Sequence, residues 1–226
     1  MGAGASVDGS NAPPTPSLTP RVMATMQTKT KLTSDELHLL GLHYRRYQVQ
    51  GDNSALPATT ISTDTASLPT GTIDRIKFQQ AMGMPEKESL YADRLFKVVD
   101  GNGDGRVSFG EFASAVSLLS TKATLAEKIK LSFDILDVDG DGQLSRDEVT
   151  TMLHTSLTEN AIQLTKDQIQ MIVAKTFAEV AGGGDAISFD TYAALVSKNE
   201  GMVSHLTLNL SYLLSVTGVQ AAIQTT

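Results

Sequence analysis

Two twelve-residue segments, 100–111 and 137–148, carry the same pattern of side chains, and this pattern constrains the fold more than any other feature of the chain. In each segment, positions 1, 3 and 5 bear side-chain oxygens, position 6 is glycine and position 12 is glutamate. The residues at positions 1, 3, 5 and 12 are Asp100, Asn102, Asp104 and Glu111 in the first segment, and Asp137, Asp139, Asp141 and Glu148 in the second. Alternate side chains that turn inward can surround one ion, so each segment is expected to fold as a metal-binding loop.

The chemistry of these side chains indicates calcium. Ca²⁺ is a hard cation that takes about six to eight oxygen ligands at roughly 2.3–2.6 Å. Glycine at position 6, Gly105 or Gly142, permits the sharp turn that wraps the loop around the ion. Position 7 supplies a backbone carbonyl, so Arg106 and Gln143 are candidate ligands through their main chain while their side chains stay outside. This spacing is that of an EF-hand loop, and the sequence predicts two calcium sites.

Helices are expected on both sides of each loop. Apolar residues there recur at helical spacing, and Thr33, Thr124 and Thr165 open three of the predicted helices with a capping pattern, in which Glu or Gln follows three residues later. The loops begin at Asp100 and Asp137, which are 37 residues apart, so the repeating unit is helix–loop–helix.

Weaker copies of the loop lie upstream and downstream of this pair. Val107 and Leu144 occupy the apolar position 8 of the two strong loops, which suits a short strand that pairs with a neighbouring loop. If Ile73 and Ile187 occupy position 8 of the weaker copies, position 12 becomes Lys77 and Thr191. Neither copy keeps the acidic ligands, so each is expected to pair with a working loop without holding calcium. The predicted fold is all-α, with two EF-hand lobes, four helix–loop–helix units of which the outer two are degenerate, and short paired loop strands.

Composition excludes several functional classes. The chain has 226 residues, 41% of them hydrophobic, and a formal net charge of −7, which argues against a nucleic-acid-binding surface. It has no cysteine, and therefore neither a disulfide framework nor a thiolate metal site. No apolar run approaches the roughly 18 residues of a membrane helix, and no nucleophile and base are grouped, so the sequence predicts a soluble protein that is not an enzyme.

Composition also divides the chain into segments. Residues 1–30 combine several prolines with small and polar residues, which predicts a disordered tail. The polar stretch 51–70 is typical of an inserted loop. The predicted units are the tail 1–30, an N-terminal lobe 31–120 that contains the insertion, a C-terminal lobe 121–200 and a C-terminal tail 201–226.

The first residues carry a lipidation pattern. Gly2 followed by Ser6 fits N-myristoylation, although a flexible start built from small residues gives the same letters by chance. A single myristoyl chain supports only weak, reversible attachment to a membrane. The predicted location is therefore the cytoplasm, with peripheral membrane contact through acylated Gly2.

The glycine-2 start, the four loop units and the helix over 35–46 together resemble calcineurin B and the calcineurin B-like calcium sensors. Segments 91–96 and 127–133 are similar to the members that regulate protein kinases. Over residues 33–213, the resemblance implies a regulatory subunit that grips an amphipathic helix in a hydrophobic groove. The helix would belong to a protein kinase or to a calcineurin-type phosphatase catalytic subunit.

The favoured function is calcium sensing, in which bound Ca²⁺ changes helix packing and opens the groove to its partner. The alternative is a calcium buffer without a regulated partner, which would expose little apolar surface when it binds the ion. Segment 137–148 offers four carboxylates and segment 100–111 offers three, so segment 137–148 is predicted to fill first. One ion in each lobe also predicts lobe-wise filling rather than cooperative filling of a pair.

Overall fold

The structure is a computed structural model, and it describes residues 20–48, 69, 71–85, 88–159, 161–182 and 184–198. The helices in these ranges are α1 (Pro20–Thr30), α2 (Ser34–Arg45), α3 (Arg75–Ala81), α4 (Leu90–Val99), α5 (Phe109–Leu119), α6 (Leu125–Leu136), α7 (Arg146–Glu159), α8 (Lys166–Val180) and α9 (Phe189–Ser197). The strands are β1 (Thr72–Ile73), β2 (Val107–Ser108), β3 (Gln143–Ser145) and β4 (Ala186–Ser188). The predicted all-α class with short loop strands is confirmed.

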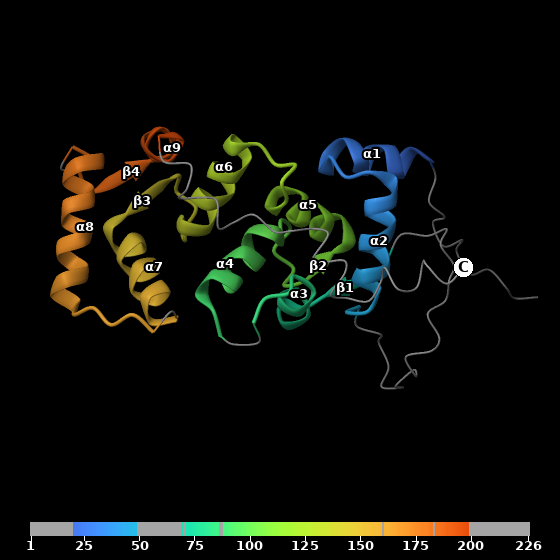
Figure 1. The fold of residues 1–226 in the computed structure, drawn as a ribbon, viewed down its shortest axis with the longest axis horizontal. Coiled ribbons are helices and arrows are strands. Elements are labelled where there is room, and N and C mark those ends of the chain that lie inside the picture. The colour runs from blue at the N-terminus through green and yellow to red at the C-terminus, as the bar shows by residue number, and fades with distance from the viewer. Residues whose placement is uncertain are drawn as a thin grey trace, which may run out of the picture.

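The elements form an elongated row that broadly follows their order in the chain (Figure 1). Helices α1 and α2 lie at one end and α8 lies at the other, with α4 and α6 packed together in the middle. Helices α4 and α5 flank the loop 100–111, and α6 and α7 flank the loop 137–148. The two candidate metal loops therefore belong to neighbouring helix pairs that meet near the centre of the molecule.

Side-chain caps set the starts of the helices. Each of Thr33, Thr124 and Thr165 accepts a hydrogen bond from the backbone N–H three residues later, and the Glu or Gln there accepts one in return from the threonine N–H. This reciprocal arrangement satisfies two donors that a helix N-terminus otherwise leaves without partners, and such caps contribute about 1 kcal/mol each. The three capping patterns predicted from the sequence are confirmed.

The loop strands pair as expected. Strand β1 runs antiparallel to β2, with Ile73 opposite Val107, and β3 runs antiparallel to β4, with Leu144 opposite Ile187. These four apolar residues are buried and occupy position 8 of their loops. Each strong loop is thus tied to one of the weaker copies.

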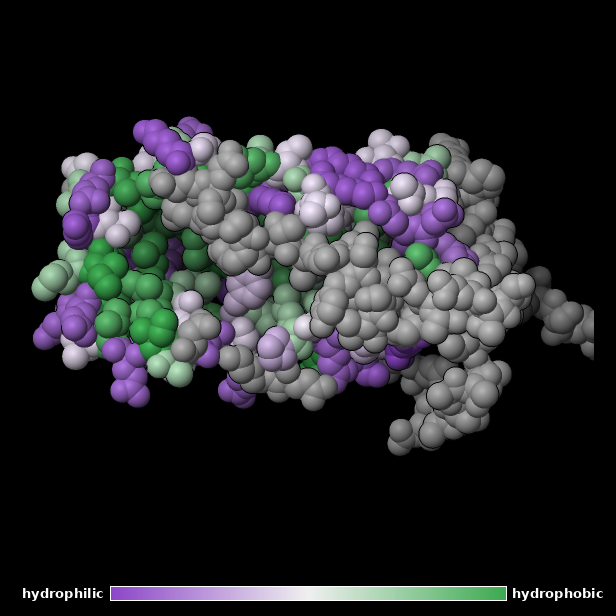
Figure 2. Space-filling model, in the orientation of Figure 1, coloured by the Kyte–Doolittle hydropathy of each residue, from purple (hydrophilic) through white to green (hydrophobic). Residues whose placement is uncertain are grey.

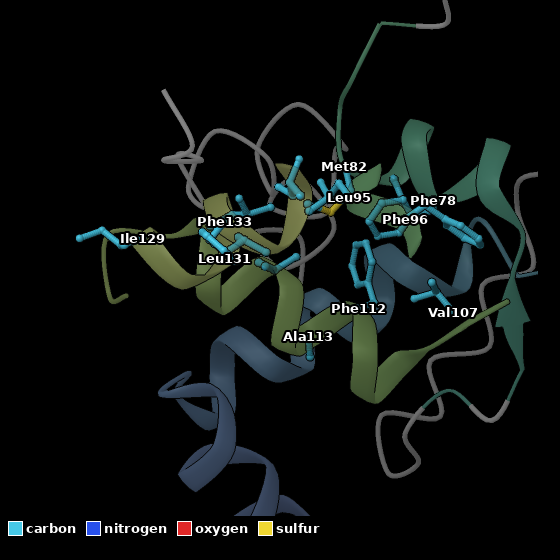
Figure 3. Packing of buried hydrophobic residues seen from close by; sticks show 14 of the residues in the cluster. Phe78, Met82, Leu95, Phe96, Val107, Phe112, Ala113, Ile129, Leu131 and Phe133 are labelled. Atoms are coloured by element: carbon cyan, nitrogen blue, oxygen red, sulfur yellow. The ribbon is translucent and has the colours of Figure 1, made fainter. Parts of the chain in front are cut away.

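Buried hydrophobic side chains form one cluster that extends through both helix pairs (Figure 3). The Phe112 ring lies 5.3 Å from the Tyr44 ring and 6.3 Å from the Phe78 ring, measured between centroids. Farther along the cluster, Phe133 packs edge-on against Tyr192 at 5.6 Å. Truncating a buried phenylalanine to alanine typically costs about 3–5 kcal/mol, so this cluster fixes the helices that carry the loops.

The expectation of a disordered tail over residues 1–30 is wrong for its last eleven residues, which form α1. Pro20 occupies the first helical position, where its missing N–H removes no helical hydrogen bond. The helix packs against α2 and α5, and the Ser117 hydroxyl donates a hydrogen bond to the buried Thr30 carbonyl. Tertiary packing, which composition does not reveal, thus holds this segment in a helix.

Three sequence-based expectations fall largely or wholly outside the described residues. They are the acylation of Gly2, the inserted loop 51–70 and the tail 201–226. Within the described ranges, no helix is both long enough and apolar enough to cross a membrane.

Candidate metal centres and the adjoining groove

The loop 100–111 is organised around its first residue. Asp100 follows the last residue of α4 and is buried, and its two carboxylate oxygens accept hydrogen bonds from the N–H groups of Asp104 (3.2 Å) and Gly105 (2.8 Å). The Asn102 side chain accepts from the Asp104 N–H at 3.0 Å and donates to the Asp104 carboxylate at 3.0 Å. These bonds bring positions 1, 3 and 5 together on the inside of one turn.

The loop 137–148 repeats this arrangement with a more acidic set. Asp137 is buried at the end of α6 and accepts hydrogen bonds from the N–H groups of Gly140 (2.7 Å) and Gly142 (3.0 Å). Carboxylate oxygens of Asp137, Asp139 and Asp141 lie within 4.8 Å of one another. Three carboxylates held this close repel one another, so a divalent cation between them would relieve the repulsion.

The glutamate at position 12 folds back across each loop. Glu111 accepts hydrogen bonds from the N–H of Gly101 (3.2 Å) and of Ser108 (2.8 Å). Glu148 accepts in the same way from Val138 (2.7 Å) and Ser145 (2.9 Å). Burial raises the pKa of Glu148, but the hydrogen bonds from Ser145, Val138 and Asp139 outweigh it and hold the pKa below its ordinary value. The charged form needed for metal binding is thus favoured.

The glycines at position 6 have the backbone conformation that the turn requires. Gly105 has φ +75° and Gly142 has φ +84°, a region that other residues rarely adopt. The following residues, Arg106 and Gln143, are exposed, which agrees with side chains that stay outside the loop.

The donor set suits a hard cation. Both loops offer oxygens only. Among the described residues, the carboxylates of Asp137, Asp139 and Asp141 cluster within 4.8 Å, and hydrogen bonds link Asp100, Asn102 and Asp104. Glu111 and Glu148 bond to backbone N–H groups of their own loops. All-oxygen sets of this kind match Ca²⁺ or Mg²⁺ rather than softer metals. The assignment of ten residues as ligands, Arg106 and Gln143 through their carbonyls, stays a prediction.

The degenerate loop near β4 uses its polar groups in other ways. Arg146 donates to the Asp185 carboxylate at 3.1 Å and to the Gly184 carbonyl at 3.0 Å. Thr191, which stands where a ligand glutamate is expected, shares a hydrogen bond with Ser188 at 3.0 Å. These contacts serve to hold the loop against α7 rather than to assemble a cluster of carboxylates.

Two charged residues that the sequence analysis does not single out connect the helix pairs. Arg94 of α4 is buried and donates to backbone carbonyls at the end of α6, and Glu159 of α7 accepts from the start of α4. The available signal is a single arginine among the apolar residues Ala92, Leu95 and Phe96 on one helix. An arginine in that position points to a buried acceptor, but the sequence does not say which.

A largely apolar groove of about 700 Å³ adjoins the second loop. Hydrophobic side chains gather around a hollow between the α7–α8 end and the middle of the molecule (Figure 2). Its walls come from α4, α6, α7 and α9, and its apolar lining includes Tyr91, Leu136, Val149, Met152, Leu153 and Leu195. Burial raises the pKa of Tyr91 to about 12, so its phenol stays neutral in the wall.

A family model described as EF hand matches residues 92–117 and 129–153, which contain the two loops. The calcineurin B protein of Schizosaccharomyces pombe is 38% identical over 141 residues, which cover 62% of this chain and 77% of that protein. Calcineurin B of Naegleria gruberi is 29% identical over 198 residues, 87% of this chain and 98% of that protein. Calcineurin B type 2 of Dictyostelium discoideum is 37% identical over 116 residues, 49% of this chain and 62% of that protein. All three relatives are named as subunits of calcineurin.

These matches agree with the resemblance found in the sequence. The family model matches the two loop units, and the two calcineurin B relatives match 62% and 87% of the chain. The chain belongs to the calcineurin B family of EF-hand proteins.

Proposed function

We propose that this chain is a calcium-sensing regulatory subunit of a calcineurin-type protein phosphatase. It binds one Ca²⁺ in the loop 100–111 and one in the loop 137–148, and it has no catalytic role of its own. The names of its relatives support a subunit of calcineurin over a regulator of protein kinases. The all-oxygen donor sets of both loops support calcium as the signal.

The observation that carries this proposal is that one helix, α7, contributes both a candidate calcium ligand and part of the groove wall. Glu148, the candidate ligand at position 12, lies in the first turn of α7. The next residue, Val149, lines the apolar groove, and so do Met152 and Leu153 one turn later. An ion that binds Glu148 therefore acts directly on the wall of the groove.

In this proposal, calcium changes the angle between α6 and α7 and reshapes the groove. Sensors of the EF-hand class convert ion binding into exposure of an apolar surface in this way. An amphipathic helix of the catalytic subunit then lies in the groove, with its apolar residues at helical spacing against the lining. The groove of about 700 Å³ has room for the side chains of such a helix.

Binding of a synthetic peptide tests this proposal. The peptide carries the amphipathic helix of a calcineurin catalytic subunit, and titration calorimetry measures its affinity in Ca²⁺ and in chelator. Binding is expected in Ca²⁺ and is expected to be at least about tenfold weaker in chelator or with Leu153→Asp, because a carboxylate in an apolar contact is costly.

Ile76→Asp serves as the matched control, since Ile76 is 63% exposed and does not line the groove. This variant is expected to bind the peptide as the unaltered protein does. Equal affinity in Ca²⁺ and chelator, together with no effect of Leu153→Asp, would favour a calcium buffer over a regulatory subunit.

We also propose that Gly2 is N-myristoylated and that the acyl chain supports weak membrane association. Co-expression with an N-myristoyltransferase and intact-mass measurement tests the modification, with Gly2→Ala as the control. An unchanged mass after co-expression would rule it out.

A further inference from the structure

Helix α4 leads into one candidate calcium loop and packs against the helices that flank the other. It leads into the loop 100–111, since Asp100 follows its last residue. It also packs against α6 and α7, the helices that enter and leave the loop 137–148. Movement of α4 therefore involves both loops.

The first connection is Arg94, whose guanidinium is buried between α4 and the end of α6. Its Nη2 donates to the Asp137 carbonyl at 2.5 Å and to the Asp134 carbonyl at 3.2 Å. Its Nε donates to the Ile135 carbonyl at 3.0 Å, and its Nη1 reaches the Val138 carbonyl at 3.4 Å. Arg94 thus holds the last turn of α6 and the first two residues of the second loop.

The physical chemistry favours arginine at this place. The last carbonyls of a helix have no partner within the helix, and a cation there also interacts favourably with the helix dipole. The guanidinium offers five donors in a rigid fork, so one side chain can bind several carbonyls whose positions are fixed relative to one another. Lysine would keep the charge but lose this geometry.

The second connection is Glu159, the last residue of α7. Its carboxylate accepts hydrogen bonds from the Leu90 N–H at 2.8 Å and from the Ser89 hydroxyl at 3.0 Å. These donors lie at the N-terminus of α4, where a negative charge is favourable. The helix that leaves the second loop therefore caps the helix that enters the first.

We propose that α4 couples the two calcium loops, with Arg94 and Glu159 as the positioning residues. An ion in the loop 137–148 fixes the end of α6, and Arg94, bound to the carbonyls there, then fixes α4, which leads into the loop 100–111. The second ion binds a loop that is already ordered, so each ion raises the affinity for the other. By linkage the factor is the same in both directions.

This inference rests on the proposed function only in that both loops bind calcium. It does not depend on the phosphatase partner or on the groove. The coupling ratio is the calcium dissociation constant of one loop with the other loop disabled, divided by its dissociation constant with the other loop intact. A loss of stability alone would weaken calcium binding in both loops without changing this ratio, so the ratio distinguishes coupling from a merely structural role.

The test measures each loop with the other filled or disabled. The amide signals of Gly105 and Gly142 in two-dimensional NMR report the loops separately, because each N–H donates to the position 1 carboxylate of its own loop. Glu148→Gln disables one loop and Glu111→Gln disables the other. In otherwise unaltered protein, disabling one loop is expected to weaken calcium binding at the other by about fivefold or more.

The same pair of measurements is then made with Arg94→Met, Arg94→Lys and Glu159→Ala. The coupling ratio is expected to fall to within about twofold of unity with Arg94→Met, and to fall clearly with the other two variants. Arg75→Met is the matched control, because the Arg75 guanidinium bonds to Asp93 of α4 and Gln79 of α3, on the first-loop side of the molecule. Its coupling ratio is expected to equal that of the unaltered protein.

Two results would overturn the inference. One is a coupling ratio within about twofold of unity in the unaltered protein, which would mean that the loops fill independently. The other is a full ratio that persists in the folded Arg94 and Glu159 variants. Should Arg94→Met fail to fold, Arg94→Lys and Glu159→Ala decide. Calcium binding that is absent from every protein would instead contradict the proposed function.

Discussion

At the scale of single residues, the glutamate at position 12 has two roles in each loop. One oxygen of Glu111 accepts from the N–H and the hydroxyl of Ser108, which caps α5, and the other accepts from Gly101 at the start of the loop. Glu148 relates to Ser145 and Val138 in the same way. Glutamine keeps one acceptor oxygen, which can serve the cap on Ser108 or Ser145, but it lacks the second oxygen and the charge that a cation needs. Glu→Gln variants are therefore expected to lose ion binding while they keep the helix cap.

The two loops are expected to fill in order. The loop 137–148 has four carboxylates among its candidate side-chain ligands, whereas the loop 100–111 has three and an amide, and ligand charge is one determinant of affinity. In a calcium titration followed by NMR, the Gly142 amide signal is therefore expected to shift before that of Gly105. The reverse order would show that loop rigidity outweighs the number of charges.

A buried histidine makes the N-terminal lobe sensitive to acid. His43 is fully buried, its Nε2 lies 2.7 Å from the Ala81 carbonyl, and within the described residues its Nδ1 has no hydrogen-bond partner. Burial lowers its pKa below the ordinary value of 6.5, although the bond to Ala81 acts in the opposite direction. The unfolded chain therefore binds more protons than the folded one, and stability falls as the pH drops below about 6.5.

Urea unfolding of the unaltered protein and of His43→Gln at pH 7.5, 6.5 and 5.5 checks this dependence. Glutamine can donate to the Ala81 carbonyl but does not titrate, so the variant is expected to lose less stability between the highest and lowest pH. His154→Gln, which alters an exposed histidine, is expected to follow the unaltered protein. Parallel curves for His43→Gln and the unaltered protein would assign the acid sensitivity to other groups.

At the scale of elements, two capping boxes are joined by reciprocal ion pairs, in which the lysine before each box binds the glutamate of the other. Both have the sequence Lys-x-Thr-x-x-Glu, over residues 31–36 and 122–127. Lys31 pairs with Glu127 of the second box, and Lys122 pairs with Glu36 of the first. These crossed ion pairs join the start of α2 to the start of α6, so the caps of two helices far apart in the chain support one another.

The carboxyl group of Glu127 reports this contact. Hydrogen bonds from Lys31 and from Thr124 lower its pKa to about 2. The folded pKa lies below the ordinary value of 4.5, so the contribution to stability is present above that pH and is lost as the pH falls toward 2. The pair is partly exposed, so its contribution is modest and decreases with added salt.

Replacing Lys31 with methionine is expected to raise the pKa of Glu127 toward 4.5, as measured by NMR titration of the side-chain carboxyl carbon. Lys175→Met is the matched control, since Lys175 pairs with Glu179 on α8, away from this contact. A Glu127 pKa that stays near 2 in Lys31→Met would show that the Thr124 cap alone accounts for the shift.

The sequence predicts elements well where the determining contacts are local. The caps at Thr33, Thr124 and Thr165 depend on residues three positions apart, and the strand registers depend on position 8 of each loop. Helix α1 does not follow from the sequence because its packing partners are α2 and α5, and composition carries no information about distant partners. The role of Arg94 is hidden for the same reason, since its acceptors lie about forty residues away in the chain.

At the scale of the whole molecule, the two lobes share a packed interface rather than only a chain connection. One hydrophobic cluster extends through both, α4 contacts both helices of the second loop, and the groove takes its walls from α4 as well as from α6, α7 and α9. The sequence predicts independent, lobe-wise filling because each strong loop has a weak neighbour. The position of α4 leads us to expect instead that calcium in one loop raises the calcium affinity of the other. The coupling ratio decides between independent and coupled filling.

Calorimetric titration with Ca²⁺ measures directly whether each of the two strong loops holds one calcium ion. We expect two ions to bind to the unaltered protein, one to Glu111→Gln, one to Glu148→Gln and none with measurable affinity to the double variant. Glu179→Gln, which removes the same charge from an exposed position outside the loops, is expected to bind two. Two ions retained by the double variant, or no binding to the unaltered protein, would show that these two loops are not the calcium sites.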